Sequence, residues 1–193
     1  MQQPSDNLVF DRTKAQAERV SELNGKMSKG TVTDAEIAEW MQTSDGALNF
    51  VMLNRLETWT TYLAAQLRGY GYAVSVTPRA EVPEQTYPLY DEATETITGY
   101  YTIPAHTEWL MSDFPTRGEV DRIRRNVDAL QAGFYSLPDW REIVYNNTLG
   151  YEQANALEWD LQRLYDWLRA MVSSFQMRQA NTIFMQAGGI LNA

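Results

Sequence analysis

The chain of 193 residues contains no cysteine and a single histidine, and these shortages exclude several kinds of site. Without cysteine there is neither a disulfide framework nor a thiolate metal site. His106, the one histidine, would have to serve any Ser-His-Asp machinery, and no nucleophile motif accompanies it. The sequence also lacks a phosphate-cradling glycine loop and an acidic cluster with calcium-loop spacing. We therefore expect no enzymatic activity, no cofactor and no metal ion.

Long apolar runs and an excess of basic residues are missing as well. No stretch approaches the roughly 20 apolar residues of a membrane-spanning helix, and residues 1–6 lack the apolar core of a signal peptide. Sixteen Lys and Arg residues stand against 25 Asp and Glu residues, which gives a net charge of −9. Because nucleic-acid binding needs a concentrated basic patch, we expect neither nucleic acid nor a membrane as a partner.

The residues that are present are typical of a folded, mainly helical protein. Hydrophobic residues make up 44% of the chain and aromatic residues 12%, too much for a disordered one. Thr13 is placed to cap a first helix, and Thr33 with Glu36 and Thr116 with Glu119 have the spacing of capping boxes. Apolar residues then recur at helical spacing, most clearly over residues 48–67 and 151–175.

Residues 78–105 have a different texture. Prolines at positions 78, 83, 88 and 104 exclude a long helix there. The β-branched and aromatic run over residues 96–103 favours a strand, with residues 87–90 as its hairpin partner. Residues 72–77 alternate in a β-like manner, and residues 182–185 are typical of a further short strand.

The predicted fold is therefore mainly α: a helical bundle of about five helices with a small β-hairpin-like excursion and a short C-terminal strand. The helical body is expected over residues 1–77 and 106–175, the excursion over 78–105, and a docking tail over 176–193. The tail would either add a strand to a partner's sheet or fold back onto residues 72–76 of its own chain.

Two groups of side chains are candidates for a role. The first has no apparent use in the helical core, so it is predicted to be an interface; it consists of Tyr87, Tyr90, Tyr100, Tyr101, Ile183, Phe184 and Met185. The second surrounds Arg55, a charge that projects close to an apolar helix face and must be paired there. Asn155 and Glu158 flank the seam of the last helix, and we expect a polar clasp between them and Arg55.

Paired carboxylates are the one catalytic pattern that this composition leaves open. Glu92 with Glu95, and Glu152 with Glu158, would suffice for a two-carboxylate glycosidase if they faced a cleft. In so acidic a chain most carboxylates are solvated, so this hypothesis ranks below the others.

Several short strings, in a fixed order, resemble a family of small proteins encoded by tailed phages and prophages of Gram-positive bacteria. They are Asp11-Arg12-Thr13-x-Ala15-x-x-x-x-Val20, Gly46-Ala47-x-Asn49-x-x-x-Leu53-Asn54-Arg55-x-Glu57, Tyr62-Leu63, Gly71-Tyr72, Trp109-x-x-x-Asp113-x-Pro115-Thr116, Asn126-Val127-x-Ala129-Leu130 and Tyr151-Glu152-x-Ala154-Asn155-x-x-Glu158. The resemblance covers roughly residues 11–76 and 106–175. It does not extend to residues 78–105 or to the C-terminal tail.

The resemblance implies a minor structural component encoded among tail and host-recognition genes. On this basis we expect a protein made in the cytoplasm of the bacterial host and incorporated into the virion tail or baseplate. Its partners would be other virion proteins, with several copies in the particle. The alternative from a different class is a carbohydrate-binding module that recognises a host surface glycan.

Overall fold

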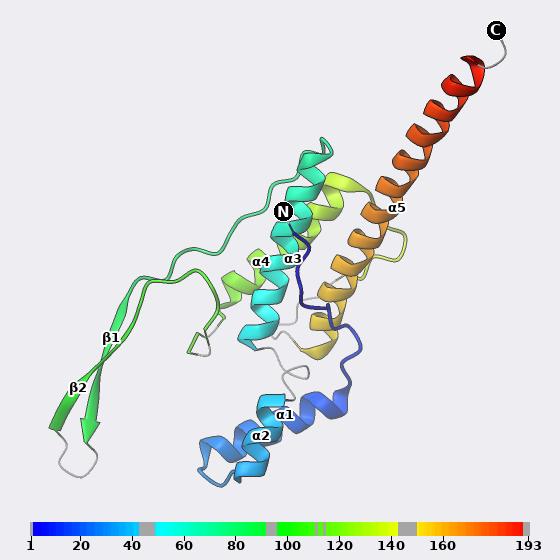
Figure 1. Ribbon diagram of the computed structural model, residues 1–193. Helices are drawn as coiled ribbons and strands as arrows, with labels where there is room; N and C mark the ends of the chain where they lie inside the picture. Colours follow the sequence, from blue (N-terminus) through cyan, green and yellow to red (C-terminus); the bar gives the residue numbers. More distant parts are fainter. Residues whose placement is uncertain are drawn as a thin grey trace.

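The computed structural model describes residues 2–42, 49–91, 96–110, 112–113, 115–142 and 150–190, with side chains left out for residues 41–42 and 180–190. Within these ranges the chain forms five helices and one two-stranded sheet, which confirms the mainly α class with a small β-hairpin (Figure 1). In chain order the elements are α1 (Lys14–Ser28), α2 (Asp34–Gln42), α3 (Phe50–Gly69), β1 (Gln85–Asp91), β2 (Thr96–Ile103), α4 (Arg117–Phe134) and α5 (Tyr151–Ile190).

The main core lies between α3, α4 and α5. Leu56 and Leu63 of α3 are fully buried, as is Val127 of α4. Leu161 and Leu164 of α5 are fully buried as well, at the spacing of three that places them on one helix face. α3 contacts both α4 and α5, so its apolar residues are covered from two sides.

α1 and α2 pair with each other at one end of this core (Figure 1). Thr13 caps α1 in a full capping box, and the side chain of Thr33 accepts a hydrogen bond at the start of α2. Leu23 is fully buried, although it lies outside the main core cluster. An ion pair of 2.7 Å between Arg19 and Glu39 joins the two helices, so this helical pair has its own small contact surface.

Residues 72–77 form no strand. Instead of a neighbouring strand, the side chain of Asn126 satisfies their backbone: its Oδ1 accepts from the Thr77 N–H at 2.8 Å, and its Nδ2 donates to the Thr77 carbonyl at 2.8 Å. Val74 is buried against Gly133 of α4, where an added Cβ would lie 2.6 Å from a Val74 methyl. The β-like alternation of these residues therefore corresponds to no strand pairing, and the Thr77 backbone hydrogen-bonds to a helix side chain.

The predicted short C-terminal strand is wrong. Residues 182–185 lie inside α5, which runs without a break from Tyr151 to Ile190. Once a helix is established, each further residue adds a hydrogen bond at the cost of ordering only itself. The tetrapeptide at residues 182–185, two of whose residues are β-branched, follows 31 helical residues and therefore continues the helix. Neither of the two strand arrangements considered for the tail is present, and α5 instead projects beyond the body (Figure 1).

Candidate interaction surface and its supports

The excursion forms an antiparallel hairpin that stands away from the helical body (Figure 1). β1 and β2 pair from Gln85↔Ile103 at the base to Asp91↔Thr96 near the tip, with a β-bulge between Leu89 and Tyr90. Among the described residues, the two strands pair only with each other. Both outer edges therefore carry unpaired backbone groups that can accept a further strand.

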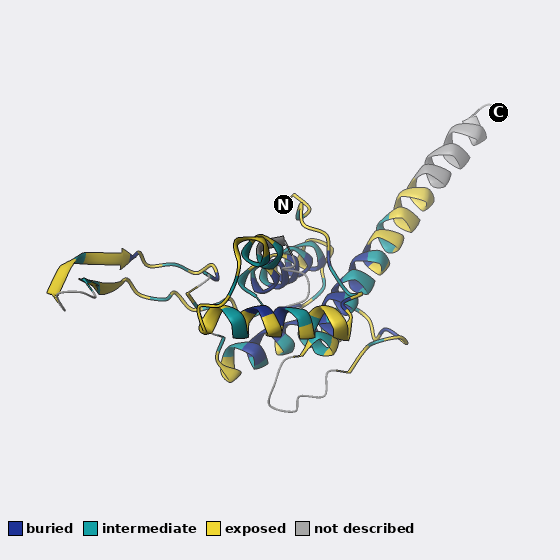
Figure 2. Cartoon of the chain, turned by 90° about the horizontal axis from the view of Figure 1, so that it is seen from below, coloured by how far each residue is buried: buried dark blue, intermediate teal, exposed yellow. Residues whose placement is uncertain are grey.

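Tyrosine side chains lie on both faces of this hairpin. Residues that pair across an antiparallel ladder share a face, so Tyr87 lies beside Tyr101 on one face. Tyr100, which is opposite Pro88, lies on the other face with Tyr90. The exposed fractions of the four tyrosines range from 48% to 67%, so the body covers none of them (Figure 2). The hairpin part of the predicted interface is thus exposed on two faces.

A half-buried polar cluster fixes the base of the hairpin to the body. The guanidinium of Arg79 lies 3.7 Å from the ring centroid of Trp109. It forms ion pairs with Asp113 at 3.0 Å and with Glu119 at 3.4 Å. Nε2 of His106 lies 3.2 Å from the same Asp113 carboxylate. His106 therefore has structural partners at the point where the hairpin begins.

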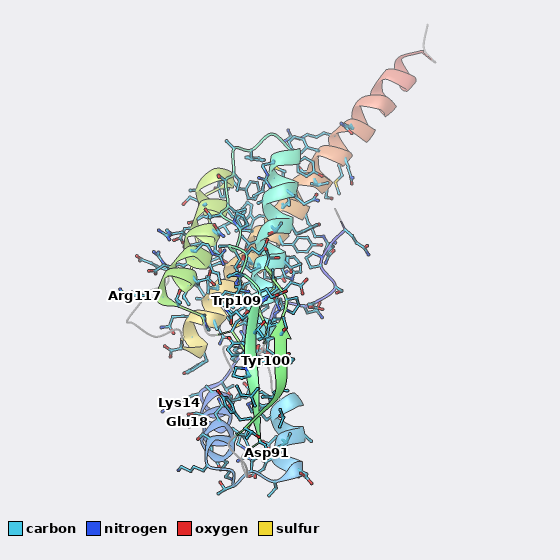
Figure 3. All side chains as sticks on the ribbon, turned by 90° about the vertical axis from the view of Figure 1, so that its left-hand side faces the viewer. Lys14, Glu18, Asp91, Tyr100, Trp109 and Arg117 are labelled. Carbon is cyan, nitrogen blue, oxygen red and sulfur yellow. The ribbon has the colours of Figure 1, made fainter. Side chains whose placement is uncertain are left out.

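Two further features make this base firm. Burial opposes the charge on Asp113, yet hydrogen bonds from the Leu110 N–H, Arg79 and His106 hold the pKa of that carboxyl below its ordinary value. The side chain of Asn54 in α3 bonds both backbone groups of Trp109, at 2.7 and 2.8 Å. Trp109 thus sits in the body while Tyr100 projects along the hairpin (Figure 3).

The hairpin region is also acidic. Residues 78–105 contain five carboxylates and one basic residue, Arg79, whose charge is already paired at the base. A surface of tyrosines and carboxylates is complementary to a partner surface that carries basic residues.

The polar clasp joins α5 to α3 and also to the N-terminal segment. Oε1 of Glu158, which is fully buried, accepts two hydrogen bonds from Arg55, at 3.0 and 2.9 Å. It also lies 3.2 Å from a guanidinium nitrogen of Arg12, and the backbone N–H of Val9 donates to Oε2. The structure therefore brings Arg55 and Glu158 together and adds a second arginine.

Asn155 belongs to the same cluster but does not contact Arg55. Its Oδ1 accepts from the backbone N–H of Arg12 at 3.1 Å, and its Nδ2 donates to the Arg12 carbonyl at 2.9 Å. Sequence reasoning missed Arg12 because residues 2–12 have no helical or strand periodicity. A signal was available, since the apolar triplet Leu8-Val9-Phe10 lies outside any amphipathic pattern and must cover something.

Asp160 is a second buried carboxyl on α5. Its Oδ1 accepts from the backbone N–H of Arg141 at 3.0 Å, and Oδ2 has no hydrogen-bond partner among the described residues. Burial raises the pKa of Asp160 to about 7, with Asp128 and Asp139 adding to the effect and Arg141 opposing it. No sequence pattern marks this group, because an aspartate in an acidic chain is normally solvated.

The remaining candidates form no catalytic arrangement among the described residues. Glu92 and Glu95 lie outside the described residues. Glu158 is sealed in the clasp, so its pair with Glu152 faces no open cleft. Ile183, Phe184 and Met185 belong to α5, and their side chains lie outside the described set.

Metal and membrane sites have no support in the part of the chain that the structure describes. No group of three His, Asp or Glu side chains there is arranged to hold a metal ion. None of the described helices combines the length and apolar character needed to cross a bilayer.

Comparison with protein-family models, with curated proteins and with solved structures finds no match for this chain. The resemblance to phage tail proteins therefore stays a prediction.

Proposed function

We propose that this protein is a non-enzymatic structural component of a phage tail or baseplate, and that its hairpin docks onto another protein of the particle. The observation that carries the docking role is the exposure of tyrosines on both hairpin faces. Tyrosine supplies large contact areas at low conformational cost and is enriched at interface hot spots. The phage context is supported by the resemblance of the sequence strings alone.

The hairpin has the physical properties of a docking element. A two-stranded hairpin is marginally stable by itself in water, so contact with a partner would stabilise it. Its base is held to the body by the cluster around Arg79 and Asp113, which restricts where the strands point. Its surplus of carboxylates favours a partner surface with basic residues.

The test compares two double substitutions in the hairpin. Tyr100→Ser with Tyr101→Ser removes one aromatic ring from each face, and Thr86→Ser with Thr102→Ser is the matched control on a paired, exposed position. Both variants should keep the circular dichroism and the melting temperature of the wild type. In purified particles, the occupancy of the tyrosine variant should fall roughly tenfold or more, while that of the control stays unchanged. Equal occupancy of the two variants would exclude the hairpin as the docking element.

A carbohydrate-binding module is the second candidate, because the exposed rings of Tyr90 and Tyr100 can also stack on sugars. A glycan array separates the two functions. Binding to a defined glycan that is lost in the tyrosine variant would favour host recognition over a purely structural role. A peptidoglycan turnover assay tests the third and weakest hypothesis, a two-carboxylate glycosidase.

A further inference from the structure

The body does not bury the described side chains at the C-terminal end of α5. Every described side chain from Ser173 to Gln179 is exposed, and Phe175 and Met177 are 52% and 65% exposed. The helix then continues to Ile190, away from the other elements (Figure 1). The body nucleates this helix, so its continuation leaves the described side chains of the projecting part accessible to a contact outside the body.

α5 carries two stripes of uncharged residues that lie side by side along the helix. Within the body the buried stripe passes through Leu161, Leu164 and Leu168. A second stripe lies one residue earlier in the sequence, at Trp167, Ala170, Ser174 and Met177, and these side chains are exposed. The two stripes therefore occupy different helix faces, and the second one is not needed for the core.

The second stripe has the spacing of a coiled-coil seam. Its steps from Trp167 to Ala170, Ser174 and Met177 are three, four and three, with a large residue at each end and two small residues between them. A seam of this kind is self-complementary, because the large residue of one helix fits beside the small residues of an identical one.

An apolar groove marks the beginning of this seam on the body. The groove has a volume of about 370 Å³ and is lined by Tyr72, Phe134, Tyr135 and Trp167 together with the first seam residues. The rings of Tyr135 and Trp167 stack at 5.3 Å and are both exposed. The seam and the groove thus form one continuous apolar strip from the body onto the projecting helix.

The distribution of charge favours a second copy of this chain as the occupant of the strip. All 25 acidic residues lie before position 170, and Arg178 is the only charged residue after it. Two acidic bodies repel each other over most of their surfaces. The projecting helix is the part of the chain where two copies can meet without opposing carboxylates.

We infer that copies of this protein associate with one another through the seam of α5 that starts at Trp167 and passes through Met177. In this contact the α5 helices of two copies pack against each other, and the second copy covers the edge of the groove around Tyr135. This inference concerns the purified chain and does not depend on the proposed function, which is tested in particles.

The experiment measures the mass of the purified full chain by sedimentation or light scattering over a range of concentrations. Met177→Glu places a charge in the seam, and Gln179→Glu places the same charge on the opposite face as a matched control. Because both side chains are exposed in the single chain, neither substitution removes a core contact, and both variants should melt like the wild type. We expect a dimer or larger species for the wild type and the control. Met177→Glu should stay at the monomer mass of 22.1 kDa or associate about tenfold more weakly.

A wild-type chain that stays at 22.1 kDa throughout the range overturns the inference. Equal association of the two variants also overturns it, because the contact would then not involve the seam. Loss of particle occupancy in the hairpin variant, with self-association intact, would show that the two surfaces are independent.

Discussion

Replacing Glu158 with glutamine tests the buried clasp directly. The substitution preserves the size of the side chain but removes its charge and turns one acceptor oxygen into a donor. Arg55 and Arg12 then lose their common carboxylate, and both guanidinium groups remain buried. The backbone N–H of Val9 or one of the arginines also faces an amide N–H instead of an oxygen.

The magnitude follows from the burial of the cluster. Glu158 is 0% exposed, and Arg12 and Arg55 are 4% and 8% exposed, so solvent screens this interaction little. Removing one partner of a buried ion pair costs about 3–5 kcal/mol, because an uncompensated charge stays behind. In a chain of this length such a loss lowers the melting temperature by roughly 6–20 °C.

Urea denaturation measures the free energy of unfolding, and Glu152→Gln is the matched control. Glu152 lies on the same helix and is exposed, so its substitution should change stability by about 0.5 kcal/mol or less. Trypsin supplies a local readout, because cleavage after Arg12 requires the buried N-terminal segment to detach. We expect faster cleavage there in Glu158→Gln than in the control.

A Glu158→Gln variant that is destabilised no more than Glu152→Gln would show that the clasp contributes little to stability. Apolar burial alone would then hold the N-terminal segment and α3 against α5. Unchanged trypsin cleavage after Arg12 would lead to the same conclusion for the N-terminal segment by itself.

Three further predictions concern other parts of the molecule. In the folded protein the pKa of Asp160 is about 7, above the ordinary value of 3.8. The protonated carboxyl therefore contributes fully to stability below about pH 4, and this contribution is lost as the pH rises through 7. Asp160→Asn keeps the acceptor for the Arg141 N–H and should stabilise the protein at pH 8 by on the order of 2–4 kcal/mol, but not at pH 4. Equal free energies of unfolding for the variant and the wild type at pH 8 would contradict this expectation. Gly133→Ala forces a methyl group against Val74 and should cost about 1–3 kcal/mol in denaturation, and an unchanged midpoint would show that the segment yields. Replacing residues 79–104 with a short Gly/Ser linker should preserve the helical circular dichroism and cooperative melting, whereas global unfolding would place the hairpin in the core.

The sequence was most informative where local chemistry determines structure. Thr13 and Thr116 marked helix starts because their side chains satisfy backbone donors that no helix residue can reach. The hairpin was predictable because residues 96–103 are mostly β-branched or aromatic, and the prolines around them exclude a long helix. Arg55 was predictable as a paired charge because a charge near an apolar helix face needs a partner.

The sequence failed where distant residues or cooperativity decide. Arg12 lies 146 positions from Glu158, and no local pattern connects them. Asp160 looks like any surface carboxylate until the fold buries it. The predicted strand at residues 182–185 rested on four β-favouring residues, and this local preference is weaker than the propagation of a long helix.

The clasp also sets an order of events while the chain is being translated. Arg55 leaves the ribosome 103 residues before the carboxylate that neutralises it, which at about 5–20 residues per second is a delay of roughly 5–20 s. During that interval α3 cannot bury its guanidinium without an unpaired charge, so α3 and α4 cannot reach their final packing alone. α5, which follows α3 and α4 in the chain, therefore completes the core and, through Glu158 and Asn155, holds the segment around Val9 and Arg12.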